Sequence, residues 1–383
     1  MSSSSPKLLE MIGQLIAIPS VSSTQARFDT SNKPIIDCLS NWLDGLGFHI
    51  EIVPSSDDKV NLVAWIGEGE DGLVLSGHTD TVNCDQTGWD TDPFQVHHAD
   101  NRLYGLGTAD MKSFLAIAIE AAKDFVDKPL KERLTIIATA DEESTMQGVR
   151  TLVEKNKKLG RFCIIGEPTS LTPVHRHKGV FMEAITLYGK AGHASNPALG
   201  NNALEGMRAV LNELDRFKQE LAEKYVDHDF IVPIPTLNLG HIHGGDNPNR
   251  ICAECELHID IRLLPGMQVG TLRDELHERI TQTVEGLDLT CKFNALFDGV
   301  PAFETSSDSR IVQLTTRHTG KNPMSVTFAT EAPFFNSMGM ETVVLGPGSI
   351  NQAHQPNEFI ELSMLGPTIN ILKSMIRSIC EQS

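Results

Sequence analysis

The 383-residue chain has little positive charge, few aromatic residues and no long hydrophobic run. Lys and Arg number 32 against 50 Asp and Glu, and a formal net charge of −18 repels nucleic-acid phosphates and anionic lipid headgroups. The longest apolar stretches, at residues 114–122 and 134–140, fall far short of the roughly 20 residues that cross a bilayer. We therefore expect neither a nucleic-acid partner nor a membrane-spanning segment.

Cysteine is also scarce, with seven residues scattered along the chain. An odd, scattered set favours reduced thiols over a disulfide framework. Cys252 and Cys255 form the one close pair, and we interpret them as strand packing because no second pair is present to complete a zinc site. The N-terminus lacks the basic start and apolar run of a secretory signal, so we expect a cytoplasmic protein.

The remaining composition is that of a folded protein, with 40% hydrophobic and 21% charged residues and enough length for two or three domains. Strand-like runs are predicted at residues 48–53, 61–66, 73–76, 134–140 and 162–165. Helical patterns are predicted at residues 34–46, 111–126 and 147–158. This alternation is typical of an α/β fold with a mixed, mostly parallel sheet flanked by helices.

The order of predicted elements changes near Gly179. Between there and Phe293 the pattern is β-α-β-β-α-β, which is typical of an α+β ferredoxin-like sandwich. The α/β alternation resumes after Phe293. We therefore expect a discontinuous α/β domain of residues 1–178 and 294–383, with a smaller domain of residues 179–293 inserted into it.

Histidines and acids gather where the predicted strands end. These positions are His78 with Asp80, Glu142 with Glu143, Glu167 and the late His354, while Asp110 lies where a helix starts. Functional groups in open α/β sheets collect beyond the carboxyl ends of the strands. Two imidazoles and several carboxylates suit Zn²⁺ or a similar ion, and so many crowded anions are unfavourable unless metal charge offsets them. The set predicts two metal ions.

The strings Gly77-His78-Thr79-Asp80, Asp141-Glu142-Glu143 and Gly192-His193-Ala194-Ser195 resemble motifs of the dinuclear zinc amidohydrolases related to aminoacylase and the co-catalytic zinc carboxypeptidases. The resemblance covers essentially the whole chain. Longer strings at residues 244–252, 330–334 and 345–356 are similar to the acetylornithine deacetylase branch of that family. The resemblance implies a catalytic metal-binding α/β domain and an inserted domain that acts as a lid and in dimerisation.

The resemblance also implies a role for each motif residue. Five side chains would bind the metal ions, zinc or else cobalt: His78 and Glu167 on one, Glu143 and His354 on the other, and Asp110 bridging both. Glu142 would be the general base. The spacing supports this role, because neighbouring residues of an extended segment point to opposite sides and leave Glu142 facing the water when Glu143 binds metal. The carboxylate of Asp80 would accept the imidazole N–H of His78 and fix its tautomer.

Four residues are expected at the substrate. His193 matches the family histidine that stabilises the oxyanion, often across a dimer interface, and the alternative is an ordinary turn histidine. Asn249 and Arg262 match positions that hold the substrate carboxylate, for which an Arg fork is suited. Glu331 is predicted to accept a hydrogen bond from a cationic amine on the substrate's side chain. The alternative is that Glu331 starts a helix and lies in solvent.

The activity implied is hydrolysis of the acetyl amide of N2-acetyl-L-ornithine, a step of arginine biosynthesis, by a homodimer formed through the inserted domain. A succinyl-diaminopimelate desuccinylase or a dipeptidase is the alternative within the family. A catalytically idle metal-binding dimerisation scaffold is the alternative from another class, which Glu142 disfavours because a scaffold does not need it. Two further motifs, His97-His98 and His241-x-His243, suggest extra metal sites, but we interpret the first as loop and the second as a strand surface.

Overall fold

The computed structural model describes residues 6–84 and 86–381, so the first five residues of the Ser-rich start lie outside it. The chain divides into two compact units. The first contains the chain up to His175, Thr305–Met324 and the residues from Thr330 onward, and the second contains Arg176–Glu304 and Ser325–Ala329. The second unit extends beyond residue 293 because its last strand, β14, runs over Thr290–Val300.

The first unit is built on a mixed sheet. Its strands lie in the order β1 (His49–Pro54), β2 (Val60–Ile66), β6 (Leu134–Thr139), β3 (Leu73–His78), β7 (Phe162–Pro168) and β17 (Glu341–Gly346). The last four are parallel to one another, whereas β2 pairs antiparallel with both β1 and β6. Strands β3, β6 and β7 are buried along their whole length, as expected for a sheet covered on both faces.

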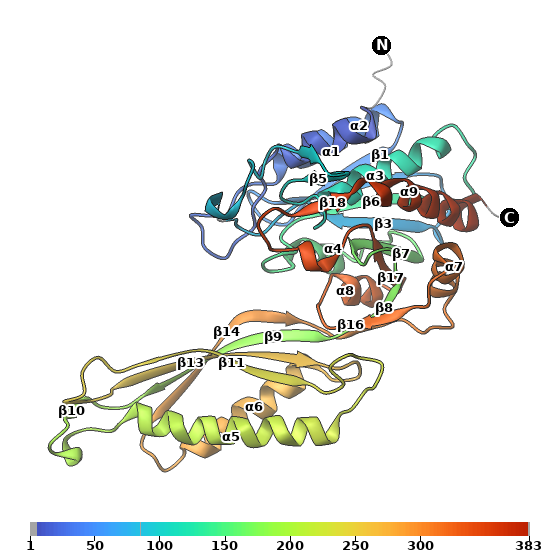
Figure 1. The fold of residues 1–383 in the computed structure, drawn as a ribbon. Coiled ribbons are helices and arrows are strands. Elements are labelled where there is room, and N and C mark those ends of the chain that lie inside the picture. The colour runs from blue at the N-terminus through green and yellow to red at the C-terminus, as the bar shows by residue number, and fades with distance from the viewer. Residues whose placement is uncertain (1–5, 85, 382–383) are drawn as a thin grey trace. The chain divides into compact units, whose positions relative to one another are not determined.

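Helices cover this sheet on both faces, with α3 and α9 on one side and α4 and α8 on the other (Figure 1). Their bounds are α1 (Leu8–Ile16), α2 (Lys33–Gly45), α3 (Lys112–Ala122), α4 (Gln147–Glu154), α7 (Arg310–Thr319), α8 (Ala332–Ser337) and α9 (Leu362–Ile376). Helix α3 is buried at almost every position because its sequence is apolar on all sides. The predicted α/β class is confirmed.

Short elements complete the first unit. Strands β4 (His97–Ala99), β5 (Arg102–Tyr104) and β18 (Phe359–Glu361) form a small sheet, so the prediction that His97 and His98 lie in a loop is wrong. Strand β8 (Val174–His177) continues the main sheet beyond β17 and pairs also with β15 (Phe303–Glu304) and β16 (Met324–Val326), where the chain passes from one unit to the other. Single turns of 3₁₀ or π helix occur at Gln86–Gly88, Lys123–Phe125, Pro197–Leu199, Ile350–Gln352 and Arg377–Glu381.

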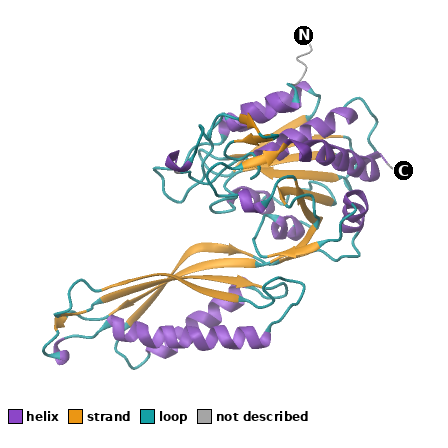
Figure 2. Cartoon of the chain, in the orientation of Figure 1, coloured by secondary structure: helices purple, strands orange, loops and turns teal. Residues whose placement is uncertain are grey.

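The second unit has an antiparallel sheet in the order β11 (Thr236–Gly244), β13 (Glu254–Leu263), β9 (Gly179–Tyr188) and β14. Helices α5 (Ala203–Lys224) and α6 (Val269–Val284) pack on one face of it (Figure 2). Along β13 alternate residues such as Leu257 and Ile259 are buried, while Glu256 and His258 are partly exposed on the opposite face. Just before β13, the short strand β12 (Arg250–Ile251) pairs instead with β10 (Gly192–His193), outside this sheet.

Among the described residues, no helix combines the length and the apolar character that a membrane crossing requires.

Candidate metal centre

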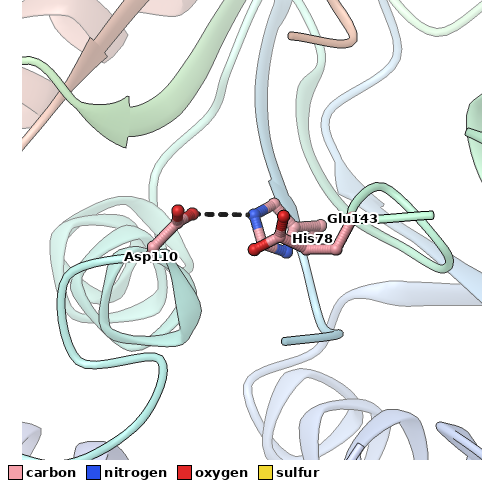
Figure 3. A group of neighbouring side chains, drawn as sticks. All are labelled: His78, Asp110 and Glu143. Carbon is pink, nitrogen blue, oxygen red and sulfur yellow. Dashed lines mark hydrogen bonds and ion pairs between the residues drawn. The ribbon is translucent and has the colours of Figure 1, made fainter. Parts of the chain in front are cut away.

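His78 and Asp110 form the buried middle of the site in the first unit (Figure 3). His78 is the last residue of β3, and its Nε2 atom lies 3.1 Å from Oδ1 of Asp110, which immediately precedes Met111 and α3. The same Nε2 atom lies 3.8 Å from Oε1 of Glu167, near the carboxyl end of the neighbouring strand β7. His78, Asp110 and Glu167 are therefore brought together as predicted.

His354 and Glu143 lie on the side of the second carboxylate oxygen of Asp110, Oδ2. Nε2 of His354 lies 2.9 Å from Oε2 of Glu143 and 3.8 Å from Oδ2 of Asp110. His354 has the left-handed φ of 61°, and its neighbours Gln352 and Ala353 belong to the loop that follows β17. One oxygen of Asp110 thus faces His78 and the other faces His354, which is the arrangement that a bridging ligand requires.

The donor set fits a pair of divalent cations. Atoms of His78, Asp110 and Glu143 lie within 4.8 Å of one another, and so do atoms of His78, Glu142 and Glu167. Among the described residues, Oε1 of Glu167 is buried without a hydrogen-bond partner. Burial, followed by the charge of Asp110, raises the pKa of Glu143 and that of Glu167. Two cations would relieve this crowding of buried carboxylates, because each favours the ionised form of its ligands.

Glu142 lies beside this centre at the start of a turn. The preceding residue, Asp141, has a φ of 58°, and its Oδ1 atom lies 2.9 Å from Nζ of Lys59. Lys59 is only 4% exposed and also lies 2.8 Å from Oδ1 of Asp29. Burial and then the charge of Glu167 raise the pKa of Glu142 well above its usual value. Sequence reasoning missed Lys59 and Asp141 as supports of the turn that carries Glu142 and Glu143.

Asp80 holds the centre in a different way from the one predicted. The hydrogen bond to Nδ1 of His78 is accepted at 2.9 Å by the main-chain carbonyl of Asp80, whereas its carboxylate Oδ1 lies 3.7 Å away. Oδ2 of Asp80 instead accepts a hydrogen bond of 3.0 Å from the backbone N–H of Glu143. Asp80 therefore links His78 to Glu143, because its side chain and its main chain serve different partners.

Glu358 is a second residue that sequence reasoning missed. Its carboxylate accepts backbone N–H groups from Gly107 at 3.0 Å, from Ala109 at 2.7 Å and from Asp110 at 3.0 Å. Burial raises its pKa to about 8. Glu358 thereby fixes the loop that presents Asp110, but it lies 248 residues from Asp110 in the chain, in no motif that links the two.

Glu331 precedes α8 and is buried, so the alternative that it lies in solvent is wrong. Its Oε2 atom accepts a hydrogen bond of 3.0 Å from the hydroxyl of Thr139, the last residue of β6. Its Oε1 atom is buried and has no hydrogen-bond partner among the described residues. Burial raises the pKa of Glu331 to about 8. An unpaired buried oxygen of this kind is a suitable acceptor for a cationic group.

The remaining candidates lie at two ends of the second unit. His193 is exposed in the β10–β12 ribbon, where its Nδ1 atom lies 2.8 Å from the hydroxyl of Ser195. The carbonyl of Asn249 accepts a hydrogen bond from the N–H of Ala194, so Asn249 lies beside His193. Arg262 lies near the end of β13, where its guanidinium donates to both carboxylate oxygens of Asp260 at 2.8 and 3.0 Å.

The sequence model of "Peptidase family M20/M25/M40" matches residues 74–378 of the chain. Among curated proteins, an acetylornithine deacetylase from Proteus mirabilis is 44% identical over 377 residues, covering 98% of this chain and 97% of its own. An acetylornithine deacetylase from Aliivibrio fischeri is 45% identical over 379 residues, with 98% and 99% of the two chains covered.

Solved structures share the fold at much lower identity. A tripeptidase from Staphylococcus aureus superposes with a TM-score of 0.77 at 20% identity, covering 98% of both chains. An M20 family metallo-carboxypeptidase from Sulfolobus solfataricus has a TM-score of 0.79 at 18% identity, covering 97% of this chain and 99% of its own. A dinuclear metal-binding peptidase from Bacillus subtilis has a TM-score of 0.68 at 13% identity, with 97% of each chain covered.

Proposed function

Because the chain belongs to peptidase family M20/M25/M40, we propose that its metal centre hydrolyses the acetyl amide of N2-acetyl-L-ornithine to L-ornithine and acetate. The relatives named acetylornithine deacetylase support this substrate, since they are 44–45% identical over nearly the whole chain. The observation that carries the proposal is the placement of Asp110 between His78 and His354, with Glu142 beside them. The product makes the reaction a step of arginine biosynthesis.

The five ligands would hold two ions, with zinc the first choice and cobalt the second, since imidazole and carboxylate suit both. His78 and Glu167 would hold one, Glu143 and His354 the other, and Asp110 would contribute one oxygen to each. Bound there, such ions lower the pKa of a bound water and polarise the acyl carbonyl. Asp80 and Glu358 keep these ligands in place through the hydrogen bonds described above.

Glu142 moves the proton. Its carboxylate accepts a proton from the attacking water and later delivers it to the nitrogen of the departing amine, as a general base and then a general acid. Burial and neighbouring carboxylates favour its protonated form, which suits the second step. The positive charge of bound ions favours the carboxylate form, which suits the first.

Glu331 gives the site its preference for a basic side chain. Its unpaired Oε1 atom would accept a charge-assisted hydrogen bond from the δ-ammonium group of the substrate. The ammonium also favours the ionised form of a carboxyl whose pKa is otherwise about 8. A neutral acyl amino acid makes no such contact.

Each site of the proposed homodimer would take second-unit residues from both subunits. Arg262 lies eight positions beyond Glu254, which is next to the β10–β12 ribbon, and at roughly 3.4 Å per position this distance is about 27 Å. One acylated amino acid is too short to contact both Arg262 and His193 of the same subunit. We therefore assign His193 and Asn249 to the partner's site in a homodimer, with Arg262 acting in its own.

The dimer surface that we propose is the free edge of the second unit's sheet. Strand β11 is one of the two edge strands of this sheet, and it exposes 45% of Leu239 and 50% of Ile242. An edge strand with exposed apolar side chains is a template for pairing with another chain.

We place the enzyme in the cytoplasm, because all seven cysteines are free thiols.

A substrate panel tests the proposed function. Protein loaded with two equivalents of Zn²⁺ or Co²⁺ is assayed on N2-acetyl-L-ornithine, N-acetyl-L-methionine, N-succinyl-diaminopimelate and a dipeptide. We expect the highest kcat/KM on acetylornithine. Preferred turnover of the succinyl substrate or the dipeptide would contradict the substrate, and no turnover of any of the four would contradict an enzyme.

A further inference from the structure

Three histidines and a glutamate gather on the second unit's sheet, on the face opposite α5 and α6. In the β11–β13 ladder, His241 lies opposite His258 and His243 lies opposite Glu256. Residues two apart on a strand share a face, and directly opposed side chains on neighbouring strands have Cβ atoms about 4.5–5.5 Å apart. The four side chains therefore form two adjoining cross-strand pairs on one surface.

Contacts within the group already resemble a ligand with its supporting carboxylate. The rings of His241 and His258 are 4.8 Å apart between centroids. Nε2 of His258 lies 2.8 Å from Oε1 of Glu256, whose Oε2 atom accepts a hydrogen bond of 3.1 Å from Thr186. A carboxylate that receives one ring N–H fixes the tautomer and leaves the lone pair on the other ring nitrogen, as in metal-bound histidines.

The group borders an open pocket of about 350 Å³. His241, His243 and Glu256 contribute to its lining, together with Cys252 and Glu254. His241 and His243 are exposed and make no part of the hydrophobic core of the second unit. Packing therefore does not account for the imidazoles on this surface. Cys252 also lines the pocket, but its side chain is buried.

We propose that His241, His243 and His258 bind one further divalent transition-metal ion, of the Zn²⁺, Ni²⁺ or Cu²⁺ class, with Glu256 supporting His258. Imidazole is a preferred ligand of these ions, and the hard cations Mg²⁺ and Ca²⁺ prefer oxygen. The exposed imidazoles of His241 and His243 turn about their side-chain torsions to bring three nitrogens within the roughly 2.0–2.1 Å of a zinc ion. His241 and His243 belong to β11, and the neighbouring strand β13 adds the third ligand, His258, and its supporting carboxylate, Glu256.

Metal counting on the dimetal-loaded protein tests this site. The protein, holding its two catalytic equivalents, is dialysed against micromolar Zn²⁺ or Ni²⁺, and bound metal is measured by elemental analysis. We expect three equivalents in the wild type and two in His241→Ala/His243→Ala, with the two equivalents of the catalytic centre retained in both proteins. Two equivalents in the wild type, or three in the double variant, would overturn the proposal.

Two further variants separate a built site from loose binding to surface histidines. His97→Ala/His98→Ala removes an exposed pair on β4, where neighbouring side chains point to opposite faces, and it should keep the third equivalent. Glu256→Gln should weaken binding of the third ion by about 10- to 100-fold, the usual effect of removing a supporting carboxylate. Loss of the ion in the His97/His98 variant, or unchanged affinity in Glu256→Gln, would show adventitious binding and overturn the proposal.

Discussion

The chemistry-bearing residues of the two units differ in how firmly the chain holds them. In the first unit, Asp110 is fixed by Glu358 and Glu143 by Asp80, each through hydrogen bonds from its backbone N–H to a carboxylate. In the second unit, His193 is exposed on a two-residue strand. A centre that gathers several buried carboxylates needs hydrogen bonds that fix its ligands, whereas groups that act on the substrate alone can be supplied by an exposed surface or by another subunit. Substitutions in each unit test this contrast.

Glu142→Ala should have the largest effect. We expect turnover to fall by about 10² to 10⁴, because general acid–base catalysis is lost, while both metal ions stay bound. The measurement is kcat together with the metal content of the same sample. Loss of both ions in this variant would contradict the role of Glu142, because it would make the residue a ligand.

His193→Ala should lower kcat by about 10² to 10³ and change KM little, since an oxyanion donor acts where charge develops. Mixing this variant with Glu142→Ala should restore part of the activity, because one site of each mixed dimer would contain both intact residues. Heterodimers are first confirmed by native mass spectrometry. Confirmed heterodimers without recovered activity would place His193 in the site of its own subunit or outside any site.

Lys59→Met should loosen the support of the catalytic turn. It leaves the carboxylate of Asp141 without its cation, and an unsatisfied buried group costs about 1–3 kcal/mol of unfolding free energy. We expect a lower midpoint in urea and a lower kcat with little change in KM. Lys157→Met is the matched control, because Lys157 pairs with Glu51 at the surface, where an ion pair contributes about 0–1 kcal/mol. Equal losses in both variants would contradict a special role for Lys59.

Glu331→Gln should have the smallest and most selective effect. A charge-assisted hydrogen bond is worth roughly 1.5–3 kcal/mol, so kcat/KM on acetylornithine should fall about tenfold or more. The value on acetylmethionine should stay nearly unchanged, since that substrate has no ammonium group. An equal loss on both substrates would assign Glu331 to the catalytic scaffold, and no loss on either would leave it a structural residue beside Thr139.

The sequence predicted what depends on local pattern. His78, Glu142 and Glu167 were predicted as site residues from their positions at strand ends, because the carboxyl ends of parallel strands meet at one edge of the sheet. The family resemblance then supplied the pairing of Glu143 with His354, which geometry supports at 2.9 Å.

Contacts between distant segments escaped that reasoning. Glu358 acts on backbone N–H groups about 250 residues away, so no side-chain motif marks it. The three-stranded sheet was missed because its strands are three residues long and β4 begins with two histidines. Asp80 is the predicted partner of His78, but it accepts the hydrogen bond through its main-chain carbonyl and not through its carboxylate. Strand periodicity places Asp80 near His78 but does not show which of its oxygen atoms accepts the hydrogen bond.

Metal titration of Asp110→Ala beside the wild type tests the central claim most directly. Metal-free protein receives Zn²⁺ in steps, and bound metal and turnover of acetylornithine are measured at each step. Asp110 gives one oxygen to each half of the centre, so we predict that wild-type activity reaches its maximum at two tightly bound equivalents and that the variant retains neither the pair nor the activity. Two tightly bound equivalents with normal turnover in Asp110→Ala would contradict the account.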